Sequence, residues 1–185
     1  MKVPQVLSPT IQVVTKTIKG AAGFAKLERV LAGVCLFVPA FLIWADDGAI
    51  RGSISAYHDM TQAQVFYFPL TMAVMLFVVN GVVKQKRSYN TVLGIMLAGV
   101  ILFNHEAFTI LHGIFAVAFF GGNAVVILVF SSKKERWFKG MLVGGIVLSG
   151  LAYFLFESFT LFWAEWVSFA IIALHYILES WGVID

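Results

Sequence analysis

Charged side chains are scarce in this chain of 185 residues, and cysteine is nearly absent. Only 12% of the residues are Asp, Glu, Lys or Arg, whereas 60% are hydrophobic and the mean hydropathy is +0.89. A soluble domain carries about 25% charged residues, so this composition excludes one and indicates a membrane protein. The single cysteine, Cys35, lies in an apolar run, which excludes an internal disulfide and a metal-binding thiol pair.

The first 26 residues lack the compact apolar core and small-residue cleavage site of a signal peptide, so we expect no removable leader. A helix start at Ser8-Pro9, with Ile11, Val14 and Ile18 near one side, predicts an interfacial amphipathic helix. A partly ordered tail is the alternative. We therefore divide the chain into a cytoplasmic or interfacial segment, residues 1–26, and a transmembrane domain, residues 27–185.

Apolar runs of membrane-crossing length follow one another along the rest of the chain. A hydrocarbon core of about 30 Å is crossed by roughly 20 helical residues. The six runs cover residues 27–45, 64–83, 88–103, 108–130, 140–156 and 161–181, and the third is the shortest. The predicted fold class is therefore all-α, a polytopic membrane bundle of six transmembrane helices preceded by the interfacial amphipathic helix.

Basic residues are distributed unevenly between the two sides of this bundle. Every Lys and Arg except Arg51 lies within residues 2–29, 84–87 or 133–139, which fall on one side of the membrane in a six-helix topology. In membrane proteins the cytoplasmic connections carry the excess of Lys and Arg. We therefore expect the protein in a bacterial inner membrane, with both termini on the cytoplasmic side. This clustering explains the net charge of +3, and no nucleic-acid partner is expected.

Residues 51–59 form the one long polar connection that is neither basic nor a simple linker. Beneath it, Glu165 and His112 lie about one helical turn inside the same membrane face, where ionisable groups are costly and usually face the bundle interior. We expect these two side chains to meet under the connection. The predicted binding pocket consists of Arg51, Ser53, Ser55, Tyr57, His112 and Glu165.

Simpler roles are open for these residues. His112 could hydrogen-bond another helix, and Arg51 could pair with Glu165 or with a nearby Asp. Towards the other membrane face, a set of residues recurs at intervals of three and four, which predicts one common helical face: Glu165, Ser168, Ile172, His175 and Glu179.

Histidine and carboxylate side chains gather near the same external face, and such ligands suit zinc. The candidate metal ligands are His58, Asp59, His112 and Glu165. No pair of them has a diagnostic spacing such as His-Glu-x-x-His, and His58 could equally be a solvated loop residue. Zinc is thus the candidate cofactor if there is one.

Three short stretches resemble a group of uncharacterised bacterial six-helix membrane proteins with a Ser-Ile-Ser-Ala-Tyr-Tyr loop after helix one. The stretches are Ser53-Ile-Ser-Ala-Tyr57, Leu111-His112-Gly-Ile-Phe-Ala116 with Phe119-Phe120, and Phe162-Trp-Ala-Glu165-Trp. His58 replaces the second tyrosine of the loop, and the Arg-Asp that follows it in the group is absent. More distantly the chain is similar to the DRAM and Sfk type of six-helix proteins and to membrane hydrolases that use Ser, Asp and His.

Three functions are consistent with these features. The first is a membrane protein whose external pocket binds lipid headgroups or a membrane partner, including a second copy of the chain. The second is a metal-dependent hydrolase of outer-leaflet lipids. The third is a proton-linked transporter of small solutes that uses Glu165 and His175. The sequence does not establish whether the protein is an enzyme.

Overall fold

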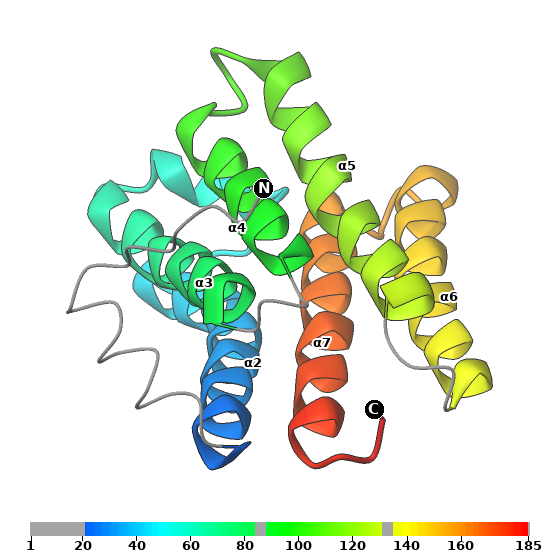
Figure 1. Ribbon diagram of the computed structural model, residues 1–185. Coiled ribbons are helices and arrows are strands. Elements are labelled where there is room, and N and C mark those ends of the chain that lie inside the picture. Colours follow the sequence, from blue (N-terminus) through cyan, green and yellow to red (C-terminus); the bar gives the residue numbers. More distant parts are fainter. Residues whose placement is uncertain (1–20, 84–87, 131–134, 185) are drawn as a thin grey trace, which may run out of the picture.

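The computed structural model describes residues 21–83, 88–130 and 135–184, and these ranges are all-helical (Figure 1). The α-helices are α2 (Ala21–Ala45), α3 (Ala63–Val83), α4 (Tyr89–Leu102), α5 (Thr109–Val125), α6 (Arg136–Leu155) and α7 (Leu161–Ser180). A short 3₁₀ helix, η1 (Ser55–Asp59), precedes α3, and a π-helical turn, η3 (Val126–Phe130), continues α5. Five of the helices are long and apolar enough to cross a membrane, and α4 is shorter. The prediction of an all-α multi-pass membrane bundle is confirmed.

The helix ends differ from the predicted apolar runs mainly at two places. Helix α2 begins at Ala21, before the predicted run at residue 27, and α6 begins at Arg136 rather than at residue 140. A helix satisfies its own backbone hydrogen bonds on both sides of the membrane boundary, so it can continue past its apolar part. The part of the predicted N-terminal segment up to residue 20, with the start of the interfacial helix, lies outside the described residues. The rest of that segment, residues 21–26, belongs to α2.

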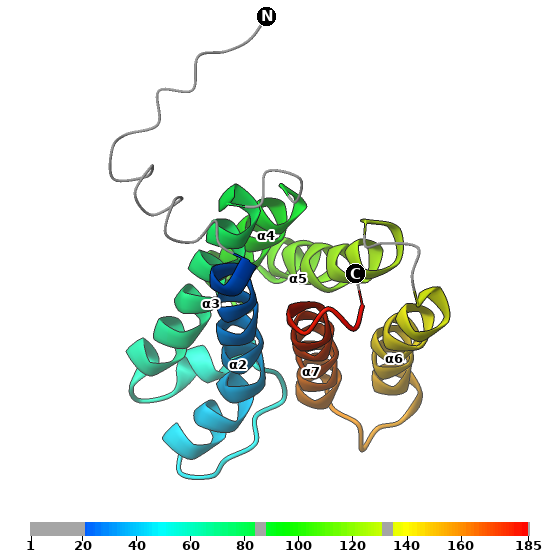
Figure 2. The same ribbon diagram turned by 60° about the horizontal axis from the view of Figure 1, so that its bottom comes forward.

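Helix α7 is the central element of the bundle. It packs against both α2 and α6, while α3 packs on α2, α4 on α3, and α5 on α4. Figure 2 shows α7 between α2 and α6, with α4 and α5 in the upper part of the view. Of the five residues predicted to share one face of α7, four are buried, namely Glu165, Ser168, Ile172 and His175, and Glu179 is half-buried.

The outward faces of the helices are apolar. Phe37 of α2, Ile110 and Val117 of α5, and Phe154 of α6 are among the exposed large hydrophobic side chains. On a soluble protein such a surface would drive aggregation, whereas in a bilayer it contacts lipid tails.

Hydrogen bonds between distant segments tie the helices together at the end of the bundle where α2 begins. The Arg29 Nε donates to Ser180 Oγ at 3.2 Å, joining the first part of α2 to the end of α7. Nearby, the Tyr176 hydroxyl donates to Asn90 Oδ1 at 3.1 Å, and Asn90 Nδ2 donates to Asn80 Oδ1 at 2.8 Å. The beginning of α4 and the ends of α3 and α7 therefore meet at the end of the bundle where α2 begins.

Two glycines let neighbouring helices approach closely. A Cβ on Gly81 of α3 would collide with the side chain and backbone of Thr91 in α4. A Cβ on Gly99 of α4 would collide with the ring of Phe115 in α5. Helix–helix contact in membranes depends on such close backbone packing, so these glycines fix the positions of α3, α4 and α5.

Candidate functional site

The connection between α2 and α3 is held in shape by an ion pair. The Arg51 guanidinium donates to the Asp46 carboxylate through Nε at 2.6 Å and through Nη2 at 3.1 Å, and its Nη1 donates to the Ala56 carbonyl at 3.1 Å. These hydrogen bonds hold the pKa of Asp46 below its ordinary value and raise that of Arg51. From the sequence, Arg51 could have paired with Glu165 or with a nearby Asp, and in the structure it pairs with Asp46.

Tyr57 anchors the same connection from inside. Its side chain is fully buried, and its hydroxyl donates a 2.7 Å hydrogen bond to the Ala49 carbonyl. The ring lies 5.7 Å from the Arg51 guanidinium carbon and 6.0 Å from the ring of Phe162 in α7. Burial raises the pKa of the Tyr57 hydroxyl. Tyr57 is thus a packing residue with a satisfied hydroxyl.

The two serines bracket the start of η1. Ser53 Oγ accepts a hydrogen bond from the Ala56 N–H at 3.1 Å, the local bond that serine commonly makes where a helical turn begins. The Ser53 and Ser55 hydroxyl oxygens are 3.0 Å apart and share a hydrogen bond. Ser53 is therefore used by the loop, whereas Ser55 is buried and faces the bundle interior.

Glu165 fastens this connection to the membrane domain. Its buried carboxylate accepts a 2.6 Å hydrogen bond from the Ile54 N–H through Oε2. One turn earlier, the Phe162 N–H of α7 donates to the Gly52 carbonyl at 2.8 Å. The first two turns of α7 are thus bonded to the loop at two points. Within the described residues, the other carboxylate oxygen, Oε1, takes part in no hydrogen bond.

A small cavity of about 20 Å³ lies beside Glu165, roughly the space that one water molecule needs. Its polar lining comes from Glu165 and Ser55, and the remaining walls are apolar and belong to η1, α3, α4, α5 and α7. The apolar lining residues are Ile54, Phe66, Leu70, Leu97, Val100, Phe119, Phe120 and Phe169. The cavity is therefore almost entirely apolar, with Glu165 and Ser55 as its two polar lining residues.

His112 lies in a different environment. It is buried in the first turn of α5, and its Nδ1 donates to the Phe103 carbonyl at 2.8 Å, because a carbonyl oxygen can only accept. Its ring meets that of His105 edge to face at 5.7 Å. Within the described part of the chain, no hydrogen bond joins His112 to Glu165, and His112 does not line the cavity.

The six predicted pocket residues thus separate into three groups. Ser55 and Glu165 line the cavity. Arg51, Ser53 and Tyr57 hold the loop above the cavity through their hydrogen bonds. His112 links α5 to the end of α4 through its hydrogen bond to the Phe103 carbonyl.

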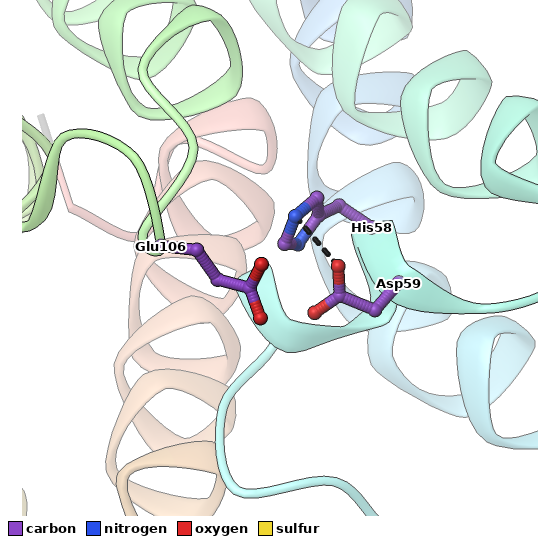
Figure 3. A group of neighbouring side chains, drawn as sticks. All are labelled: His58, Asp59 and Glu106. Atoms are coloured by element: carbon purple, nitrogen blue, oxygen red, sulfur yellow. Dashed lines mark ion pairs between the residues drawn. The ribbon is translucent and has the colours of Figure 1, made fainter.

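The predicted metal ligands are likewise only partly brought together. His58 Nε2 lies 2.7 Å from Asp59 Oδ1, and the third ligand atom in reach belongs to Glu106, not to His112 or Glu165 (Figure 3). Glu106 was missing from the predicted set, although its position in the next connection on the same membrane side was a usable signal. Which loops touch depends on the packing of α3, α4 and α5, which the sequence does not reveal.

Comparison with known protein families finds a match over residues 37–180 to the family described as "Family of unknown function (DUF7103)". The matched region runs from the middle of α2 to the end of α7 and includes the loop, the cavity and Glu106. No curated protein and no solved structure matches the chain.

Proposed function

The chain belongs to this family of unknown function, DUF7103, and we propose that it is an integral membrane protein that binds lipid headgroups beneath the loop at residues 51–59. The observation that carries the proposal is a cavity with almost wholly apolar walls whose lining includes Glu165 and Ser55. A mostly apolar site with a few polar residues suits an amphiphile better than a polar solute.

The chemistry of Glu165 favours a headgroup that donates hydrogen bonds. Glu165 uses Oε2 for the Ile54 N–H and keeps Oε1 for another donor, and Ser55 lines the same cavity. A carboxylate and an ammonium group form a charge-assisted hydrogen bond, which is about twice as strong as a neutral one. The cavity has room for a group the size of an ammonium, so the rest of an aminophospholipid stays outside it.

The proposal includes an orientation. The cavity end of the bundle faces the outer leaflet of a bacterial inner membrane, and both termini lie in the cytoplasm. This is supported by the distribution of Lys and Arg, because all of them except Arg51 occur in segments that a six-helix topology assigns to the opposite side. The pairing of Arg51 with Asp46 leaves no net charge on that ion pair at the cavity end.

The other readings rest on less. The likeness to proteins with a Ser-Ile-Ser-Ala-Tyr-Tyr loop depends on three short stretches, and the likeness to the DRAM and Sfk type depends on the helix plan. The transporter and hydrolase alternatives remain predictions from the sequence. A membrane partner or a second copy of the chain would compete with lipid for the cavity face of the bundle. The experiment below therefore includes such binding among its outcomes.

Native mass spectrometry of the detergent-purified chain tests the proposal, with phosphatidylethanolamine as the amine-bearing lipid and phosphatidylglycerol as its comparison. We expect wild type to retain phosphatidylethanolamine about tenfold better, the equivalent of roughly one charge-assisted hydrogen bond. Glu165→Gln keeps an acceptor for Ile54 but loses the charge, so this preference should disappear. Glu157→Gln, at an exposed position, should retain it.

Three results would overturn the proposal: equal retention of both lipids by wild type, an equal loss of preference in Glu157→Gln, and occupation of this face by a second copy of the chain in place of lipid.

A further inference from the structure

Three metal-ligating side chains from two separate connections converge outside the cavity. His58 and Asp59 belong to η1, between α2 and α3, and Glu106 belongs to the connection between α4 and α5. One ligand atom of each lies within 4.8 Å of the other two. Figure 3 shows the Glu106 carboxylate directed across the gap between the two connections toward His58 and Asp59.

The imidazole of His58 is oriented by a backbone hydrogen bond. Its Nδ1 lies 3.1 Å from the Ser55 carbonyl oxygen. A carbonyl can only accept, so Nδ1 carries a proton and Nε2 is the nitrogen left to bind a metal. In metal-binding histidines, the ring nitrogen that does not bind the metal commonly donates to a backbone carbonyl, which fixes the tautomer and the orientation of the ring. Nε2 is also the atom that faces Asp59.

The spacing of the three donors suits a small divalent ion after modest adjustment. Zinc–nitrogen and zinc–oxygen bonds of about 2.0–2.2 Å place the ligand atoms of a tetrahedral site roughly 3.3 Å apart. The pair of His58 and Asp59 is slightly closer than this at 2.7 Å. The Asp59 and Glu106 residues are exposed, so their carboxylates can adjust without disturbing the core.

We propose that His58, Asp59 and Glu106 bind one zinc ion, which clamps η1 to the connection between α4 and α5. One nitrogen and two carboxylate oxygens are ligands that zinc accepts, and three protein donors leave a fourth position for water. The site joins η1, whose residue Ser55 lines the cavity, to the connection between α4 and α5, so bound zinc fixes η1 in place. This inference does not depend on lipid binding.

Isothermal titration calorimetry tests the proposal with zinc chloride and the full chain in detergent, purified with an affinity tag that contains no histidine and stripped of metal beforehand. We expect one zinc ion per chain. Glu106→Gln should weaken zinc affinity at least tenfold, because even residues that only support a metal ligand contribute about 10–100-fold. His105→Gln is the matched control, since His105 precedes Glu106, is exposed, and lies outside the cluster.

Thermal unfolding of the same proteins provides a second readout that does not depend on the calorimetric signal. At a fixed zinc concentration, zinc should raise the melting temperature of wild type and His105→Gln more than that of Glu106→Gln, because weaker binding stabilises the folded state less. Glu106 is exposed and makes no hydrogen bond within the described residues, so the substitution should leave the metal-free protein folded. Absence of saturable binding, or equal affinity in wild type and Glu106→Gln, would overturn the proposal.

Discussion

The Ile54 backbone N–H and the Glu165 carboxylate are joined by a 2.6 Å hydrogen bond that connects the loop after α2 to the N-terminal part of α7. Because both groups are buried, neither can exchange this partner for bulk water. The bond therefore determines how the loop sits on the bundle.

Replacing Glu165 by Leu should destabilise the protein more than replacing it by Gln. Leucine leaves the buried Ile54 N–H without an acceptor, which costs about 1–3 kcal/mol, whereas the Gln carbonyl can still accept. Thermal unfolding in detergent measures the difference, with Glu157→Leu at an exposed site as control. Equal melting temperatures for Glu165→Leu and Glu165→Gln would show that the bond contributes nothing.

The effects of changing Glu165 and His112 should be additive. Their hydrogen bonds go to different partners, the Ile54 N–H and the Phe103 carbonyl. For independent sites, the double variant Glu165→Gln, His112→Phe should lose the sum of the two single losses to within about 0.5 kcal/mol. A larger coupling energy in the unfolding experiment would instead support the shared polar cluster expected from the sequence.

The ion pair of Asp46 and Arg51 should make stability depend on pH in the acid range. Hydrogen bonding to Arg51 lowers the pKa of Asp46 in the folded state, so the folded protein binds this proton less readily than the unfolded chain. The stabilisation is therefore complete above the ordinary aspartate pKa, near pH 4, and is lost as the pH falls through the lowered value.

Asp46→Asn should lack this part of the acid dependence, as followed by unfolding between about pH 2 and 6. Asp47→Asn is the matched control, because Asp47 is exposed and its left-handed backbone, with φ of 53°, also suits Asn. The same acid dependence in Asp46→Asn and wild type would contradict the assignment.

Gly81→Ala should destabilise the bundle by about 1–3 kcal/mol, the usual range for overpacking. The added methyl group meets the backbone of Thr91 as well as its side chain, and the backbone cannot turn away. Gly113→Ala has open space around the new methyl group and should be neutral or slightly stabilising. If both variants unfold at the wild-type temperature, α3 and α4 are less tightly packed at this point than the contact implies.

The proposed orientation predicts which introduced cysteines react in intact cells. Ala49→Cys, in the exposed loop after α2, should be labelled by a membrane-impermeant maleimide, whereas Ser88→Cys, at the exposed start of α4, should be labelled only after the membrane is opened. Wild type serves as control, because its only cysteine, Cys35, is buried. The reverse pattern would place both termini outside the cytoplasm.

Hydropathy was sufficient to predict the helices because each transmembrane helix is a continuous run of apolar residues, which can be recognised without knowing how the helices pack. The run predicted at 161–181 is α7 almost to the residue, and its buried polar face followed from the spacing of Glu165, Ser168 and His175. The π-helical end of α5 at Val126–Phe130 was not predictable in this way, since its composition is as apolar as that of the α-helix before it.

The contacts between connections were harder to predict. Glu165 stood out because a carboxylate at membrane depth needs a partner, but the partner is a backbone N–H, which every loop residue offers. Glu106 lies near Asp59 only because α3, α4 and α5 are packed as they are. Such proximity leaves no spacing signal in a single sequence.

The shortness of α4 has a consequence for the surrounding bilayer. Its 14 residues rise about 21 Å, roughly 9 Å less than the hydrocarbon thickness that the longer helices match. Such hydrophobic mismatch is relieved by local thinning of the bilayer, which draws headgroups towards the protein on that side. Leu97 and Val100 of α4 line the cavity, so we expect headgroups to approach it where the membrane is thinnest, and we expect the protein to favour lipids with short acyl chains.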